Sequence, residues 1–382
     1  MKELEVYIHI PFCAKKCNYC DFLSFPKSSE LQESYIRRLC GEIKASANLF
    51  AERPVSSVFI GGGTPSLLDP YLITELMETL RSAIRVLPDA EITIECNPGS
   101  TLRHKFAKYR EAGINRLSIG LQSANNEELK TLGRIHSFEE FLKCYQGARM
   151  EGFDNINVDL ISCFPTQTPE SWKKTLKTVL MLKPEHVSVY NLQLEEGTPF
   201  CESVNAGTMA LPPEEIMTEI DSITSRLMAQ SKYSRYEISN YAKPGKESRH
   251  NLGYWTGRDY IGFGLGASSL INGVRFKNGT SFEKYLGSIS RELDWDNYLL
   301  EKQNVEKLTE QEKMREFMIL GLRLSKGVGS IEFYRRFGRQ LADVYGDILD
   351  KYEKLGLLEK DGYDIRLTER GFEVANTVMC EF

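Results

Sequence analysis

The 382-residue chain lacks any apolar run near the roughly 20 residues that a membrane-spanning helix needs. Its first residues, MKELEVYIHI, lack the basic segment and long apolar segment of a secretory signal. It also lacks an excess of positive charge, because 48 Lys and Arg stand against 53 Asp and Glu, for a net charge of -5. A nucleic-acid surface would require the opposite balance. We therefore expect a cytoplasmic protein without a transmembrane segment and without a nucleic-acid partner.

A fourth clustered cysteine is also lacking. Cys13, Cys17 and Cys20 stand within eight positions, and Cys40 is too isolated to join them. Structural zinc sites use four ligands, so a zinc knuckle fits poorly, although zinc or redox-reactive thiols stay open as alternatives. Iron–sulfur cubanes are held by thiolates, usually four. Three thiolates would leave one iron without a protein ligand, which points to an exchangeable ligand at that iron.

The other six cysteines are scattered, and in a reducing cytosol we expect them to be small buried hydrophobic residues rather than disulfides. They are Cys40, Cys96, Cys144, Cys163, Cys201 and Cys380.

Short β-branched runs alternate with segments of helical spacing at least six times, which predicts an α/β fold of parallel βαβ units. Six units suggest an incomplete or closed barrel of the (β/α)6 type. Polar or special residues stand at the C-terminal ends of the runs, where the loops of such barrels converge on a site. The expected strands are residues 5–12, 56–63, 91–98, 116–123, 155–162 and 186–193.

The pattern changes after the barrel core, which we expect over residues 1–205. Residues 206–304 form an aromatic and glycine-rich extension of the barrel. Residues 305–382 are mainly helical and end in a segment like the small wing of a winged helix. They hold 13 Lys and Arg against 15 Asp and Glu. Since reading DNA requires positive charge, we expect a structural or docking domain.

The Cys-x3-Cys-x2-Cys motif, with Tyr19 before its last cysteine and GGGTP at residues 61–65, resembles the radical S-adenosylmethionine superfamily. The resemblance implies a [4Fe-4S] cluster on Cys13, Cys17 and Cys20, with the methionine end of S-adenosylmethionine on the fourth iron. Further motifs, among them IECNPG, RLSIGLQS and LGRIH, are similar to the branch of oxygen-independent coproporphyrinogen dehydrogenase. This similarity implies that S-adenosylmethionine contacts Tyr7, Tyr19, Gly62, Gly63, Thr64, Glu95, Gln122, Arg134 and Asp159.

Two features of that dehydrogenase are lacking, namely a further cysteine, replaced here by Phe22, and a longer N-terminal extension. Instead, RHNLGYW at residues 249–255 resembles the hallmark of the HemW family of heme chaperones. The resemblance implies heme binding and delivery to heme-accepting proteins such as respiratory enzymes, including membrane-bound ones, and leaves a homodimer open. Oxidative decarboxylation of coproporphyrinogen III remains the alternative activity, and radical chemistry on another substrate is a weaker one.

Within this motif, His250 is the candidate axial ligand of the heme iron, because imidazole is a common one. A simple loop-holding role for His250 remains the alternative. Lys243, Lys246 and Arg249 could meet the heme propionates. Ser268 occupies a position at which relatives often carry histidine, so a second axial histidine is not expected there.

Overall fold

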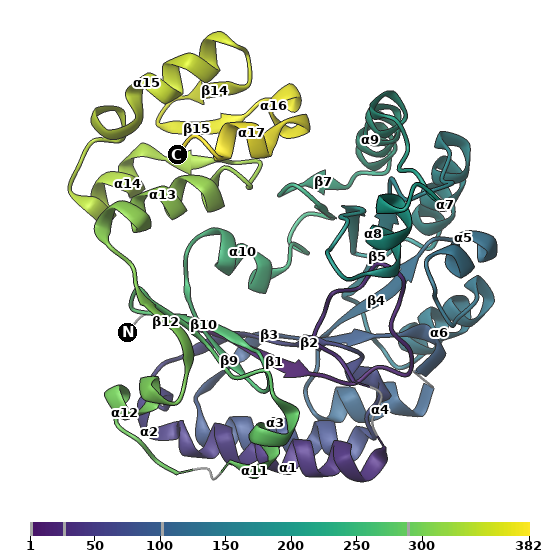
Figure 1. The fold of residues 1–382 in the computed structure, drawn as a ribbon, viewed down its shortest axis with the longest axis vertical. Coiled ribbons are helices and arrows are strands. Elements are labelled where there is room, and N and C mark those ends of the chain that lie inside the picture. Colours follow the sequence, from purple (N-terminus) through teal and green to yellow (C-terminus); the bar gives the residue numbers. More distant parts are fainter. Residues whose placement is uncertain (1–2, 26–27, 101–102, 289–290) are drawn as a thin grey trace.

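The computed structural model describes residues 3–25, 28–100, 103–288 and 291–382. Its described strands include twelve that form one strongly curved sheet (Figure 1). The centre of this sheet is six parallel strands that neighbour one another in chain order, so the predicted α/β fold is confirmed. These strands are β1 (Leu4–Ile10), β2 (Val55–Gly62), β3 (Val86–Cys96), β4 (Arg116–Gln122), β5 (Ile156–Ser162) and β6 (His186–Asn191).

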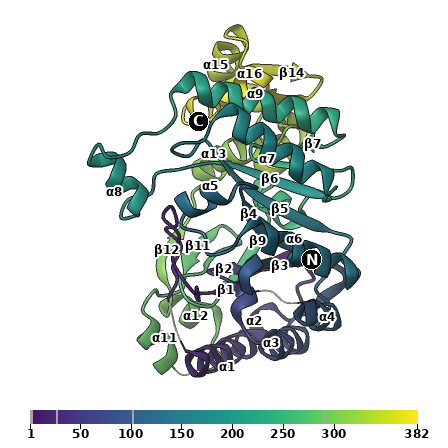
Figure 2. The same ribbon diagram turned by 90° about the vertical axis from the view of Figure 1, so that its right-hand side faces the viewer.

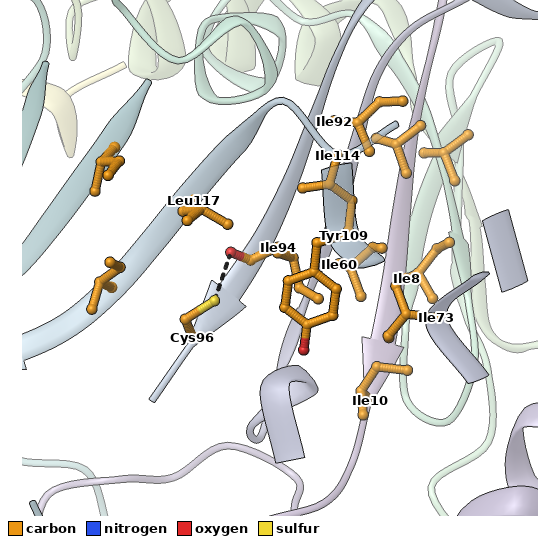
Figure 3. Close-up of a cluster of buried hydrophobic side chains, with 14 of the residues drawn as sticks. Ile8, Ile10, Ile60, Ile73, Ile92, Ile94, Cys96, Tyr109, Ile114 and Leu117 are labelled. Carbon is orange, nitrogen blue, oxygen red and sulfur yellow. Dashed lines mark hydrogen bonds between the residues drawn. The ribbon is translucent and has the colours of Figure 1, made fainter. Parts of the chain in front are cut away.

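Helices cover the outer face of these strands and create the main core there. Figure 3 shows Ile8 and Ile10 of β1 beside Ile73 and Tyr109, which come from two of those helices, in one buried cluster. The covering helices are α1 (Ser29–Ala45), α3 (Pro70–Ala83), α4 (Arg103–Glu111), α6 (Phe138–Met150) and α7 (Pro169–Met181). Shorter helical segments are α2 (Ala47–Phe50), η1 (Pro65–Leu67), η2 (Pro98–Ser100), α5 (Asn126–Thr131) and α8 (Pro199–Asn205).

The inner face of the sheet is polar and aromatic rather than aliphatic. Because side chains alternate along a strand, Glu5, Tyr7 and His9 of β1 face away from the core formed with the helices. The ring of Tyr7 stacks on Phe59 of β2, and Phe59 stacks in turn on His250 of α10 (Arg249–Trp255). Helix α10 therefore lies inside the curve of the sheet, opposite α1, α3 and α4 (Figure 1).

The segment after α8 extends the sheet at both edges. Helix α9 (Glu214–Gln230) leads to β7 (Ser234–Arg235) and β8 (Asn240–Ala242), and β8 pairs antiparallel with β6. After α10, β9 (Asp259–Phe263) pairs parallel with β1 at the other edge. The order continues with β10 (Ser268–Ile271), β11 (Val274–Lys277), α11 (Phe282–Gly287), α12 (Trp295–Leu300) and β12 (Gln303–Lys307).

The last residues form a body with its own apolar cluster, which includes Met318, Phe333, Leu349 and Val378. A small sheet in the order β13-β15-β14 supplies the expected wing. Figure 2 shows this body above the barrel strands. Its elements are α13 (Glu310–Gly321), β13 (Val328–Gly329), α14 (Ser330–Phe337), α15 (Leu341–Lys354), β14 (Leu358–Asp361), β15 (Asp364–Leu367), α16 (Glu369–Glu373) and α17 (Ala375–Met379).

None of the helices in the described part of the chain combines the length and apolar character required to cross a membrane.

Candidate functional site

The three clustered cysteines lie on a loop that leaves β1 and returns to it, which we call the cysteine loop (residues 11–25). The Phe25 amide donates to the Pro11 carbonyl over 2.8 Å, and the Cys13 amide donates to the Phe25 carbonyl over 3.2 Å. All three thiols are free and partly exposed. The backbone bonds thus close the loop while the sulfurs stay accessible.

A second set of contacts holds the middle of the cysteine loop against the segment after β4. The Asn18 amide donates to the Leu132 carbonyl over 3.1 Å, and its side chain donates to the Thr131 carbonyl over 2.9 Å. Arg134 places Nη1 3.5 Å from the Cys17 sulfur and donates from Nη2 to the Gly120 carbonyl over 2.9 Å. A guanidinium at this distance can donate a hydrogen bond to the sulfur. Arg134, expected to contact S-adenosylmethionine, therefore lies beside a cluster cysteine.

Burial raises the pKa of the Cys20 thiol to about 11. Binding of Cys20 to a cationic iron would therefore release a proton.

The glycines at the end of β2 allow the cysteine loop to pack closely against this strand. The Gly63 amide donates to the Ile10 carbonyl over 2.9 Å, and a Cβ at Gly63 would lie only 2.6 Å from the Phe12 carbonyl oxygen. Gly62 has φ +114°, and a Cβ there would lie 2.5 Å from the His9 ring. Thr64 Oγ1 lies 3.5 Å from the Cys13 sulfur. Residues of the two predicted motifs are thus in direct contact.

Two carboxyl groups face the interior next to this motif. Glu95 accepts a hydrogen bond from the Gly62 amide over 3.0 Å, and burial together with the charge of Asp159 raises the pKa of Glu95 to about 8. Asp159 accepts from Ser118 Oγ and Asn157 Nδ2, both over 2.8 Å, and burial raises its pKa. Acceptors placed in this way suit the ammonium and ribose hydroxyl groups of a nucleoside cofactor.

Gln122 ends β4 in a left-handed conformation, with φ 73°. Its side-chain nitrogen would lie 3.0 Å from a Cβ placed on Gly120, so both residues border the same interior space. Such backbone geometry in a residue other than glycine is costly and concentrates at functional sites.

Tyr7 and His9 act as a pair. Tyr7 Oη lies 3.0 Å from His9 Nδ1, and His9 Nε2 lies 2.9 Å from the Leu23 carbonyl. Since a carbonyl only accepts, Nε2 carries the proton and Nδ1 accepts from Tyr7. His9 was not predicted from the sequence; the available signal was its spacing of two from Tyr7 within a strand. Tyr19 packs against the apolar cluster of Leu132, Ile161, Phe164 and Phe200, and its hydroxyl lies beside Arg134 and Cys17.

His250 is enclosed at the other end of the barrel interior. It is 1% exposed, its Nδ1 lies 2.8 Å from Ser57 Oγ, and its Nε2 lies 3.0 Å from Tyr254 Oη. Burial lowers the pKa of His250 to about 3, so the ring is neutral. Glu91 accepts hydrogen bonds from the His250 and Arg249 amides and fixes the start of α10. Both imidazole nitrogens are occupied, so iron ligation would require one of these bonds to break.

A pocket of about 420 Å³ runs from Tyr7 and His9 past α10 to α13. This volume lies in the range of ordinary ligand pockets. Ser268, at which a second axial histidine was not expected, also lines it. The other lining residues are Tyr254, Trp255, Gly257, Arg258, Tyr260, Gly266, Ala267, Leu270, Arg275, Glu316 and Leu320.

The cations expected at the propionates lie elsewhere. Lys243 donates to the Lys183 carbonyl over 2.8 Å, Lys246 to the Asp154 carbonyl over 3.3 Å, and Arg249 to the Asp89 carbonyl over 2.6 Å. None of these three described side chains lines the pocket.

The residues at the site are compatible with a cubane. Among the described residues, no three His, Cys, Asp or Glu side chains are placed to chelate one metal ion. A cubane distributes its thiolates over separate irons and does not need the sulfurs to meet at one point. The accessible thiols, the Arg134 cation and the glycine seat agree with such a group.

Comparison with known proteins gives the family. The model of the radical SAM superfamily matches residues 7–179, and that of the HemN C-terminal domain matches residues 308–374. "Heme chaperone HemW" of Bacillus subtilis is 33% identical over 379 residues, covering 99% of this chain and 98% of its own. The chain belongs to the HemW family.

The HemW relative of Escherichia coli is 34% identical over 380 residues, covering 99% of this chain and 98% of the relative. A solved structure, coproporphyrinogen III oxidase (HemN) from Escherichia coli described as a radical SAM enzyme, matches with a TM-score of 0.85 at 27% identity. It covers 99% of this chain and 89% of the other. The HemW family thus shares its fold with an oxidase, so the fold alone does not separate chaperone from enzyme. Membership in the superfamily implies a [4Fe-4S] cluster and S-adenosylmethionine.

Proposed function

We propose that this protein binds heme and transfers it to acceptor proteins, while a [4Fe-4S] cluster on Cys13, Cys17 and Cys20 holds S-adenosylmethionine. The observation that carries the heme proposal is the pocket between α10 and α13, because two residues of the family motif, Tyr254 and Trp255, line it. Their aromatic faces suit a planar macrocycle.

The architecture supports the cofactor proposal. The cysteine loop is closed by backbone bonds and seated on Gly63, so its thiolates are preorganised. Glu95, Gln122 and Asp159 provide acceptors and an amide around the same interior, next to Tyr7 and Thr64. When bound, the cluster supplies electron transfer to the sulfonium. The chain's own residues orient the cofactor and exclude water.

We propose that His250 can be an axial ligand of the heme iron only when one of its hydrogen bonds to Ser57 and Tyr254 opens. While both bonds stay closed, His250 affects heme binding by positioning α10. If His250 is an axial ligand of bound heme, His250→Ala changes both the affinity and the Soret band. If it only positions α10, His250→Gln, which retains hydrogen-bonding groups, preserves more of the affinity than His250→Ala.

The deciding experiment supplies anaerobically reconstituted protein with coproporphyrinogen III and S-adenosylmethionine, and measures protoporphyrinogen. The chaperone proposal expects no appreciable turnover together with saturable heme binding in a Soret titration. Turnover without heme binding would instead support the oxidase activity named for the HemN structure.

A further inference from the structure

Arg323 belongs to the C-terminal body but is fixed to the barrel extension. It follows α13, and the next residue, Leu324, forms an antiparallel bridge with Glu237. Ser325 donates from its amide to the Tyr236 carbonyl over 3.0 Å and from its hydroxyl to the Arg235 carbonyl over 2.8 Å. The backbone that carries Arg323 is therefore held in place.

The guanidinium of Arg323 is packed but poorly satisfied. It lies 4.2 Å above the ring centroid of Trp255, and its side chain is 26% exposed. Its ion-pair partner is Glu237, at 3.8 Å, which is beyond hydrogen-bond distance. Among the described residues, Nε of Arg323 has no hydrogen-bond partner. A guanidinium offers five donors, so most of them are available to a ligand.

Glu237 is not placed to satisfy them. Its Oε1 accepts from the Ser239 amide over 2.8 Å and from the Asn240 side chain over 2.5 Å. Its Oε2 finds no hydrogen-bond partner in the described part of the chain. The carboxylate offsets part of the buried charge of Arg323 but leaves its planar donor edge unused.

The neighbouring Tyr190 shows that this corner faces open interior space. Tyr190 is the last residue but one of β6, and it is 43% exposed. Its neutral phenol lies near Asp159 and Glu95 on one side and near Arg323 on the other. Arg323 is not itself among the residues that line the candidate heme pocket, but Trp255, on which it stacks, is, so the guanidinium lies against the wall of that pocket.

We propose that Arg323, stacked on Trp255, binds a carboxylate of the ligand, so that the C-terminal body completes the binding site. This inference rests on the proposed function. The planar fork of arginine matches a carboxylate in two-point contact. The shared chemistry is an organic carboxylate, supplied either by a heme propionate or by the methionine carboxylate of S-adenosylmethionine.

The test uses full-length Arg323→Gln, with Arg335→Gln on exposed α14 as the matched control, since Arg335 is 73% exposed. Dissociation constants are measured for heme, for heme dimethyl ester and for S-adenosylmethionine. We expect Arg323→Gln to weaken heme binding about 10-fold or more, as for loss of a charged hydrogen bond, while binding of the ester stays unchanged. The control should match the unmodified protein.

Other outcomes are equally informative. A loss confined to S-adenosylmethionine supports the same subsite with the cofactor as its ligand. Equal losses for heme and its ester, or no loss for any ligand, overturn the inference. If the unmodified protein fails to bind heme, the proposed function fails, and the S-adenosylmethionine arm still decides the role of Arg323.

Folding of the variant is checked by its thermal midpoint. If Arg323→Gln does not fold, Arg323→Lys retains the charge without the planar fork and is expected to show an intermediate loss. In addition, the unmodified protein must itself prefer heme over the ester by the same factor. The proposal is overturned if the unmodified protein lacks that preference and Arg323→Lys also leaves the dissociation constant of S-adenosylmethionine unchanged.

Discussion

Glu5 lies on the inner face of β1, where it is fully buried against α10. A Cβ at Gly253 would lie 1.6 Å from its Oε1, so the helix approaches the strand this closely only because residue 253 is glycine. Neither carboxyl oxygen has a hydrogen-bond partner among the described residues. Burial raises the pKa of Glu5 to about 8, against the opposing charge of Arg258. The group is therefore mostly protonated at neutral pH.

This pKa gives a prediction about stability. The folded state holds a proton on Glu5 that the unfolded chain releases above about pH 4.5, so stability is lost as pH rises toward 8. Glu5→Gln keeps the side chain neutral and should reduce that loss by on the order of 1–4 kcal/mol at pH 8. The free energy of unfolding of both proteins is measured by urea unfolding at pH 5.5, 7 and 8.5. Exposed Glu33→Gln, in α1, is the control, and an unchanged pH slope in Glu5→Gln contradicts the prediction.

A second residue-scale prediction concerns the seat of the cysteine loop. Gly63→Ala places a methyl 2.6 Å from the Phe12 carbonyl oxygen, a backbone atom that moves only with the loop. We expect the reconstituted variant to hold less than half of the iron and sulfide of the unmodified protein while the rest of the chain stays folded. Gly346→Ala, where the new methyl meets nothing within 4 Å, is the control. Full iron and sulfide content in Gly63→Ala would contradict this role.

At the scale of elements, the repeated strands could be predicted from the sequence, whereas the contacts between distant segments could not. The six parallel strands were predictable because each is a short β-branched run, and every expected range overlaps an observed strand. The parallel pairing of β9 with β1 could not be predicted, because it joins Leu4 to Asp259, which are separated by most of the chain. The motif at residues 249–255 could be recognised, but its burial inside the sheet depends on Glu5, Ser57 and Glu91, whose inward orientation only the fold reveals.

The start of α10 offers an element-scale prediction. Glu91 accepts from the Arg249 amide over 3.0 Å, the His250 amide over 3.1 Å and Ser248 Oγ over 3.3 Å. Glu91→Gln weakens these charged hydrogen bonds and should lower stability by about 1–3 kcal/mol. Hydrogen exchange should quicken at residues 248–256 more than in β2. Asp89→Asn, which removes only an exposed ion pair of 3.6 Å with Arg249 at the same helix, is the control, and uniform exchange throughout the chain would contradict a local role.

At the scale of the whole molecule, α10 connects the two apolar clusters. Arg336 of the C-terminal body donates to the Thr256 carbonyl over 3.0 Å, directly after α10. A second pocket of about 670 Å³ lies between the same parts, bordered by Trp255, Phe317 and Leu324 among others. The two bodies therefore meet around the family motif, and a ligand there would contact both.

This arrangement predicts how heme acts on the molecule. If heme occupies the pocket lined by Trp255 and Leu320, it bridges α10 and α13, and a ligand at 100 times its Kd stabilises the folded state by about 2.7 kcal/mol. Hydrogen exchange, measured with and without heme, should become slower in both helices when heme binds and should not change in the distant α1. Leu320→Glu, which puts a charge into the pocket wall, should abolish both effects, whereas exposed Leu355→Glu should preserve them. Slower exchange in the barrel strands alone would place heme away from the C-terminal body.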